Sequence, residues 1–370
     1  IADLSVADRD DGLTLLWRLN LVNRTRTDRF WMLPIVQEYA RGKLAEAPDV
    51  EQVLRDRWVR WYQNLLEGYP ADPRIYEETP NIVSVLFWLP SRQRWEELVQ
   101  QIDKGIMVLY DTGSLSSVLE IGSSLLNQVL ITGSVELLRF SWLSRYGDGM
   151  SLYGRFDEFQ EKWESLIALL EEGKTEKHPE LDAIRLGIQA RIARWKAWTD
   201  RQHLGPAIRV IEQAVDELSH LDRPADEILL FTLNSLGVLY LLARDPDRAE
   251  QTFLRGLDAL SKCETCVVSP TSWDAVLRGN IAIVAARRGD YEKARDGLYQ
   301  ILPNFHEKTD LAEAYMLLAV YEYHLGNLPR AIELGFQAER LFAELGIVKP
   351  PWEEFEYQEW LKIKNTYLRK

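Results

Sequence analysis

Residues that could bind metal or perform catalysis are present, but their spacing matches no known pattern of a metal or catalytic site. Cys263-x-x-Cys266 offers two of the four ligands that zinc takes, and no second pair accompanies it. The five histidines show no ligand spacing, and no nucleophile–base set or H-E-x-x-H pattern stands out. The sequence therefore predicts no metal and no catalytic residues. The two cysteines are interpreted as an incidental loop pair or an opportunistic disulfide.

The segment Ala168–Thr175 fits a relaxed phosphate-loop pattern that ends in Gly173-Lys174-Thr175. A functional phosphate loop follows a strand and starts a helix, whose first N–H groups hold the phosphates. Here the segment ends a predicted helix, and Glu171 and Glu172 stand where the phosphates would lie. A helix C-terminus also has the wrong dipole sign for an anion. We therefore expect no ATP hydrolysis by this chain alone.

Composition predicts an all-α chain that does not bind nucleic acid generally. The 370 residues are 46% hydrophobic and 27% charged, and apolar residues recur at helical spacing. The net charge of −13 disfavours a phosphate-binding surface. The sequence contains no run of eighteen apolar residues, so we expect no membrane-spanning helix. Two cysteines favour a reducing, cytoplasmic location, and the start at Ile1 suggests a piece of a longer protein.

The elements that would position any site are helical hairpins. The clearest copy has Leu236-Gly237-x-x-Tyr240 followed by Ala249-x-x-x-Phe253, which matches the tetratricopeptide-repeat signature. Two further copies keep the twelve-residue offset between small residues, and each has a turn of glycine with Asp or Asn: Ala282/Ala294 with Gly289-Asp290, and Ala319/Ala331 with Gly326-Asn327. Weaker copies surround the turns at Asp111–Leu115, Gly154–Phe156 and Leu204–Ala207.

These repeats predict a right-handed α-solenoid over residues 49–345 that presents a concave binding surface. Residues 346–370, with Pro350-Pro351 before an amphipathic stretch, predict a C-terminal capping helix. Most of the thirteen tryptophans, such as Trp58, Trp95, Trp142 and Trp195, lie among apolar helical positions, which favours packing over a ligand cage.

The first 48 residues differ from the repeats. A helix over 12–20 leads to two short predicted strands, Leu21-Val22 and Phe30–Met32, on either side of a polar turn. Pro34 then begins a helix that runs to about Leu44. Helix, hairpin and helix in this order predict the closing half of a winged-helix fold.

Two stretches resemble a known family. Leu15 to Val22 with Arg29 to Arg41, and Glu78 to Leu89, look like the end of the winged-helix domain and the following segment in bacterial STAND/NB-ARC signal-transducing ATPases. The resemblance implies a helical-repeat sensor arm beside an upstream ATP- or ADP-binding domain that this chain lacks. It also implies a Met-His-Asp motif whose histidine contacts nucleotide. Here Met32-Leu33-Pro34 stands at that position, and a leucine side chain cannot donate a hydrogen bond.

The expected function is recognition of a protein or peptide, without a cofactor in this chain. In tetratricopeptide arrays the first helix of each repeat lines the groove, and the aligned positions are Lys196, Asn234, Val238, Ile283, Met316 and Tyr323. A stripe of Arg185, Arg191, Arg194 and Lys196 is interpreted as a solvated helix face, or as a site for an acidic peptide or phosphate. Alternative functions are a DNA-contacting regulator fragment, a stand-alone repeat scaffold, or a helical enzyme fragment.

Overall fold

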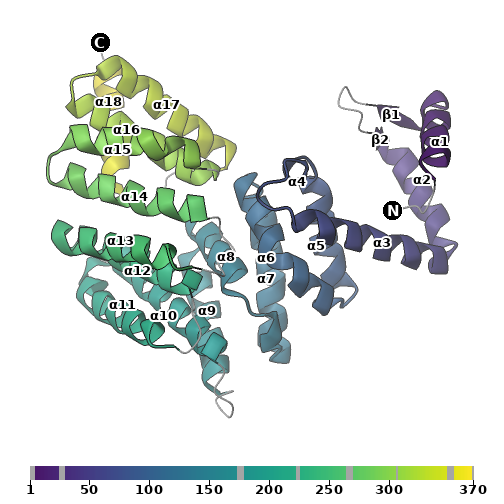
Figure 1. Ribbon diagram of the computed structural model, residues 1–370, viewed down its shortest axis with the longest axis horizontal. Helices are drawn as coiled ribbons and strands as arrows, with labels where there is room; N and C mark the ends of the chain where they lie inside the picture. The colour runs from purple at the N-terminus through teal and green to yellow at the C-terminus, as the bar shows by residue number, and fades with distance from the viewer. Residues whose placement is uncertain are drawn as a thin grey trace. The chain divides into compact units, whose positions relative to one another are not determined.

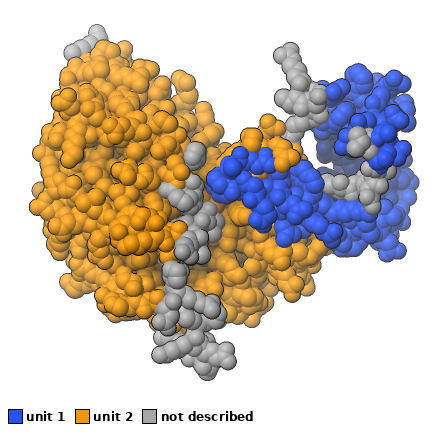
Figure 2. Space-filling model, viewed as in Figure 1, with its two compact units in different colours: residues 1–72 blue, residues 73–370 orange. Residues whose placement is uncertain are grey.

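The computed structural model describes residues 5–24, 30–172, 179–221, 226–263, 270–305, 307–347 and 354–368. The chain forms two compact units, Ile1–Asp72 and Pro73–Lys370 (Figure 2). Residues 49–72, predicted to begin the repeats, belong to the first of these units. Each unit has its own helices and is described separately.

The first unit contains the predicted helix, hairpin and helix. Its elements are α1 (Val6–Arg18), β1 (Val22–Arg24), β2 (Phe30–Met32), α2 (Pro34–Ala45) and α3 (Pro48–Leu66). The strands pair antiparallel with Val22 opposite Met32. Pro34 and Pro48 occupy the first helical turn, where the missing N–H costs nothing. The assignment of this unit to a winged-helix domain stays a prediction.

The second unit is an all-α solenoid of antiparallel hairpins, with successive pairs stacked on one another (Figure 1). It begins with α4 (Arg74–Glu77), α5 (Thr79–Ser91), α6 (Trp95–Asp111) and α7 (Leu115–Thr132). The following pairs are α8 (Phe140–Leu152) with α9 (Phe156–Glu172), α10 (Pro179–Thr199) with α11 (Leu204–Ser219), α12 (Asp226–Leu242) with α13 (Pro246–Leu260), α14 (Pro270–Arg287) with α15 (Tyr291–Ile301), and α16 (Lys308–His324) with α17 (Leu328–Glu344). Short 3₁₀ turns cover Val135–Leu137, Arg201–His203 and Leu302–Asn304, and α18 (Glu354–Leu368) ends the described chain.

The turns inside the hairpins follow the local sequence. Gly289 and Gly326 have φ of 87° and 83°, the left-handed conformation that glycine adopts without strain. Asp290 then caps α15 by accepting a hydrogen bond from the N–H of Lys293 at 3.1 Å. These features confirm the predicted turns between the two helices of a hairpin at Gly289 and Gly326.

Close helix packing explains the small residue in the repeat signature. A Cβ atom on Gly237 would lie 2.4 Å from Cε1 of Phe253, whose side chain is completely buried. Any larger residue at position 237 would therefore push α12 away from α13. Among the large side chains predicted to fill such interfaces, Trp142 and Trp195 are buried, whereas Trp58 and Trp95 are half-buried.

Among the described residues, one helix is long and apolar enough to cross a membrane by length and composition. This helix is α7, and 39% of its apolar window is buried inside the second unit. Its inner face includes Leu125, Leu126 and Val129. The same helix brings Gly122 against the ring of Tyr146, where an added Cβ would lie 2.6 Å away.

Candidate functional site

The inner helices of the second unit surround a cavity of about 210 Å³. Its walls come from α8, α10, α12, α14 and α16, the first helices of successive hairpins, with single residues from α6 and α18. The apolar part of the lining includes Phe140, Phe231, Val238, Trp273 and Ile283. Concave walls that combine apolar groups with a few converging polar groups are typical of ligand sites.

Residues of α8 and of the segments that flank the last hairpin, α16 and α17, meet beside this cavity. Nη2 of Arg145 on α8 lies 2.6 Å from Oε1 of Glu307, which precedes α16, and Nη1 donates to Oε2 at 3.1 Å. These residues are 162 positions apart. The hydroxyl of Tyr153 at the end of α8 also donates to the carbonyl of Leu345 at 3.1 Å. These contacts close the concave face around the cavity, and we name the Arg145–Glu307 pair the clasp.

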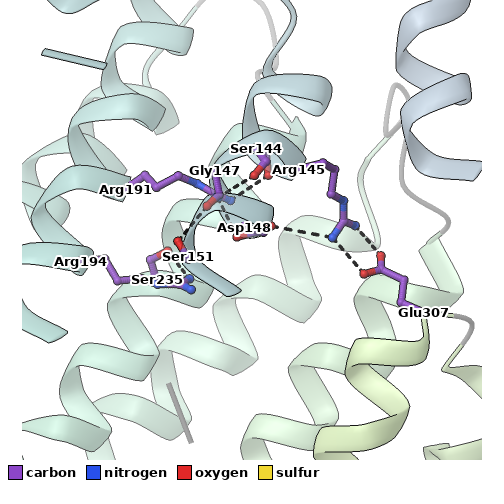
Figure 3. Close-up of polar contacts among 9 residues, drawn as sticks. All are labelled: Ser144, Arg145, Gly147, Asp148, Ser151, Arg191, Arg194, Ser235 and Glu307. Atoms are coloured by element: carbon purple, nitrogen blue, oxygen red, sulfur yellow. Dashed lines mark hydrogen bonds and ion pairs between the residues drawn. The ribbon is translucent and has the colours of Figure 1, made fainter. Parts of the chain in front are cut away.

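A second arginine, Arg191, is completely buried and does not line the cavity. Figure 3 shows its contacts with Ser144 and Asp148. Its Nη1 donates to the carbonyl of Ser144 and to Oδ1 of Asp148, both at 2.7 Å, and its Nη2 donates to Oγ of Ser144 at 2.8 Å. The guanidinium carbon lies 4.1 Å from the ring centroid of Phe231. These contacts join α10 to α8 and α12.

Arg194, one turn later on α10, lines the cavity itself. Its Nη1 donates to Oγ of Ser235 at 3.3 Å (Figure 3). Its guanidinium carbon lies 5.3 Å from the ring centroid of Trp198. No carboxylate among the described residues forms an ion pair with Arg194, and its buried Nε has no hydrogen-bond partner. Burial, followed by repulsion from Arg191, lowers the pKa of Arg194 to about 10.

Two asparagines from neighbouring repeats meet at the cavity wall. Nδ2 of Asn280 on α14 donates to Oδ1 of Asn234 on α12 at 2.7 Å. An amide side chain has two donors and one acceptor oxygen with two lone pairs. Each asparagine therefore keeps hydrogen-bonding capacity for a group inside the cavity.

The cavity lining has an excess of negative charge. The lining contains three arginines and six acidic residues. The arginines are Arg145, Arg194 and Arg287, and the acidic residues are Asp148, Glu227, Glu307, Asp310, Glu313 and Glu356. Burial raises the pKa of Glu307 to about 7, because Asp111, Asp148 and Glu313 add to the desolvation that Arg145 opposes. Burial and Glu307 together raise the pKa of Asp310 well above its usual value.

The raised pKa of Glu307 predicts a pH-dependent stability. An acid that binds its proton more tightly in the native state lowers the free energy of unfolding as pH rises, here between about 4.5 and 7. For one proton, the slope is at most about 1.4 kcal/mol per pH unit. We expect Glu307→Gln to flatten this slope, measured by urea unfolding at pH 5, 6 and 7. Parallel curves for the variant and the wild type would contradict the prediction.

Three of the six predicted groove residues line the cavity: Asn234, Val238 and Ile283. The other three lie elsewhere. Met316 is completely buried and therefore offers no surface to a ligand. Tyr323 is 39% exposed and its ring contacts His324 outside the cavity lining. The binding roles themselves stay predictions.

Lys196 and Arg185 face a different surface of α10 from the cavity. Nζ of Lys196 lies 3.0 Å from Oε1 of Glu164 on α9, and both basic residues line a second hollow of about 560 Å³ among α9, α10 and α11. The basic stripe is therefore divided between two faces. The interpretation as a solvated face is wrong for Arg191, which is completely buried, and Arg194 is half-buried in the cavity wall.

Other residues of the cavity had no separate sequence signal. Arg145, Asp148 and Glu307 are charged residues among many on helical segments, and only the closing of the solenoid brings them together. Asn280 could have been predicted from the repeat alignment, in which Ala282 of one repeat corresponds to Gly237 of the repeat before it. Asn280 and Asn234 lie close to these two positions and are 46 residues apart. An asparagine in both repeats near the same register is a signal of a shared surface.

The remaining motifs add no second site among the described residues. No group of three or more His, Cys, Asp or Glu side chains is placed to hold a metal ion there. Cys263 is disulfide-bonded, while Cys266 and Gly173-Lys174-Thr175 lie outside the described residues. In the first unit, Met32 ends β2, Leu33 precedes α2, and Pro34 is its first residue. The carbonyl of Leu33 accepts from the N–H of Gln37 at 3.0 Å.

Comparison with known proteins finds likeness in structure only. No protein-family model matches the sequence, and no curated protein matches it. A Rap protein complexed with Competence and Sporulation Factor is 11% identical over 83% of this chain and 79% of that chain, with a TM-score of 0.49. PlcR of Bacillus thuringiensis, in complex with the peptide PapR7 and DNA, is 14% identical over 68% and 81%, with a TM-score of 0.48. A tetratricopeptide repeat protein of Parabacteroides merdae is 12% identical over 78% and 99%, with a TM-score of 0.41.

Proposed function

We propose that the second unit binds a peptide, or an extended segment of a protein, in the concave cavity. The observation that carries this proposal is the cavity wall itself, which inner helices from successive repeats form together. Its volume of about 210 Å³ lies below the range of about 300–1,000 Å³ for drug-sized ligands. A short stretch of peptide therefore fits better than a large cofactor, and the chain acts by recognition rather than catalysis.

Asn234 and Asn280 are the groups best suited to hold a peptide backbone. A peptide unit presents one donor and one acceptor, and an amide side chain offers the complementary pair. Because both side chains come from adjacent repeats, they can contact successive peptide units of an extended segment. Phe231, Val238 and Ile283 provide apolar surface beside them for the side chains of that segment.

The test is binding of random hexapeptides to the purified chain, measured by retention and mass spectrometry. We expect the Asn234→Ala, Asn280→Ala double variant to bind the retained peptides about tenfold more weakly, since each lost hydrogen bond contributes about 0.5–1.5 kcal/mol. Asn127→Ala is the matched control, because it removes an exposed amide from the surface of α7. Equal affinity of the double variant and this control would refute the assignment.

We propose further that this unit is the sensor arm of a larger cytoplasmic STAND-type ATPase. The support is the resemblance at residues 15–41 and 78–89, followed by the repeats. Occupation of the cavity would change nucleotide-dependent switching only through different affinities for its two states. The test is ATP turnover of the full-length protein with and without a retained peptide. Unchanged turnover would refute the coupling while leaving peptide binding intact.

A further inference from the structure

Arg194 is a cation in the cavity lining that forms no ion pair with any of the described residues. Arg194 has one hydrogen bond, to Ser235, while its Nε remains buried and unsatisfied. Trp195, Trp198 and Phe231 lie about its guanidinium, with ring centroids 5.3, 5.3 and 5.5 Å from the guanidinium carbon. A buried guanidinium is costly unless an anion or several acceptors compensate it. The rings restrain its position, so an incoming anion would meet a preformed partner.

The cavity also contains a carboxylate that lacks a partner. Asp310 lies in the first turn of α16 and is half-buried, and its side chain has no hydrogen bond or ion pair with the residues that the structure describes. Arg145 is a cation whose charge opposes the rise in the pKa of Asp310, but it is paired with Glu307 in the clasp. Burial and Glu307 raise its pKa, which shows how poorly the surroundings compensate a negative charge at this point.

Arg194 and Asp310 line one cavity, yet no ion pair joins them. Along the chain, the inner helices α12 and α14 come between α10, which carries Arg194, and α16, which carries Asp310. An anion alone would approach Arg194 against the excess of carboxylates in the lining, and a cation alone would leave Arg194 uncompensated. A ligand that carries both charges satisfies the two groups at once.

We propose that the cavity selects peptides of mixed charge, with a carboxylate bound by Arg194 and an ammonium or guanidinium group bound by Asp310. This inference rests on the proposed function and specifies the chemistry of its ligand. The charged groups belong to the peptide termini or to its side chains. Asn234 and Asn280 lie on the two inner helices between α10 and α16, where they can contact the intervening backbone.

Three pools of random hexapeptides distinguish the sources of charge. The first pool has blocked termini and uncharged residues only, the second has blocked termini and charged side chains, and the third has free termini and uncharged residues. We expect the chain to retain the second or the third pool at least about tenfold better than the first. Preference between these two pools then assigns the charges to side chains or to termini.

Variants assign each charge to its residue. Arg194→Gln is expected to weaken binding of the retained peptides about tenfold or more, and neutralising their carboxylates should remove this difference. Arg194→Lys keeps the charge and should restore part of the affinity, since it lacks the planar guanidinium. Asp310→Asn should also weaken binding, and this difference should disappear when the basic groups of the peptide are acetylated. Arg185→Gln, on the other face of α10, is the matched control, and thermal unfolding verifies the fold of each variant.

The outcomes separate the two proposals. Retention of no pool would overturn peptide binding and the charge selection together. Equal retention of all three pools, or retention of the uncharged pool alone, would leave peptide binding intact and overturn charge selection. Selective retention that is unaffected by Arg194→Gln and Asp310→Asn would also overturn it, because other residues would then bind the charges.

Discussion

Replacement of Arg191 by methionine is expected to lower the free energy of unfolding by about 3–5 kcal/mol. The side chain is completely buried and donates three hydrogen bonds, to the carbonyl and hydroxyl of Ser144 and to Asp148. Methionine fills much of the volume of the arginine side chain but cannot pair with Asp148. The remaining ion pair of Asp148 is the longer one to Arg145, at 3.9 Å. Removing one partner of a buried ion pair is costly because the other charge remains inside. Urea unfolding measures the change.

Arg185→Met is the control for this prediction. Arg185 is on the same helix, but its ion pair with Asp182 is long, at 3.8 Å, and partly exposed. Such pairs contribute about 0–1 kcal/mol, so the control variant should unfold close to the wild type. A loss at Arg191 no larger than that at Arg185 would show that the buried network does not hold α8, α10 and α12 together.

The second large effect is expected at the end of the solenoid. Trp360 on α18 is completely buried, and its Nε1 donates to Oε1 of Glu339 at 3.0 Å. Its ring lies over Gly335 on α17, where an added Cβ would come within 2.2 Å of Cη2. Trp360→Ala should cost about 3–5 kcal/mol, since it removes a large apolar side chain and leaves a cavity. We expect lower unfolding stability and faster amide exchange in α17 and α18.

Tyr367→Ala is the matched control on α18, because the ring of Tyr367 is 45% exposed. It should change stability by less than about 0.5 kcal/mol. If α18 caps the solenoid, Trp360→Ala should lower the unfolding stability much more than Tyr367→Ala does. If Trp360→Ala unfolds like Tyr367→Ala and exchange in α17 stays slow, then α18 does not protect the last repeat.

The repeat hairpins could be predicted because their signals are local. Gly237 with Ala249, and the turns at Gly289 and Gly326, mark where helices approach or reverse, and a few neighbouring residues determine these conformations. Of the residues that line the cavity, Asn234, Val238 and Ile283 could be proposed in the same way, since they follow from the register of the first helix of each repeat.

Met316 shows the limit of this register argument. It lies on an inner helix like Ile283, yet it has no exposed surface. The side chains that cover a helix at a given turn depend on every neighbouring helix, and the sequence of one repeat does not contain that information. Tyr323 fails to reach the cavity for a related reason, since it lies near the end of α16 and contacts His324.

The sequence by itself determined the helical hairpins, their turns and the existence of a concave face, because periodicity, glycine and capping residues act over short distances. Only the tertiary structure decided which charges meet inside that face. Arg145 and Glu307 come together across 162 positions. Arg191 is buried and Arg194 is half-buried in the cavity wall, while Arg185 and Lys196 lie on another surface. The physical reason is that burial and charge pairing depend on contacts between distant helices, which arise when the solenoid closes on itself.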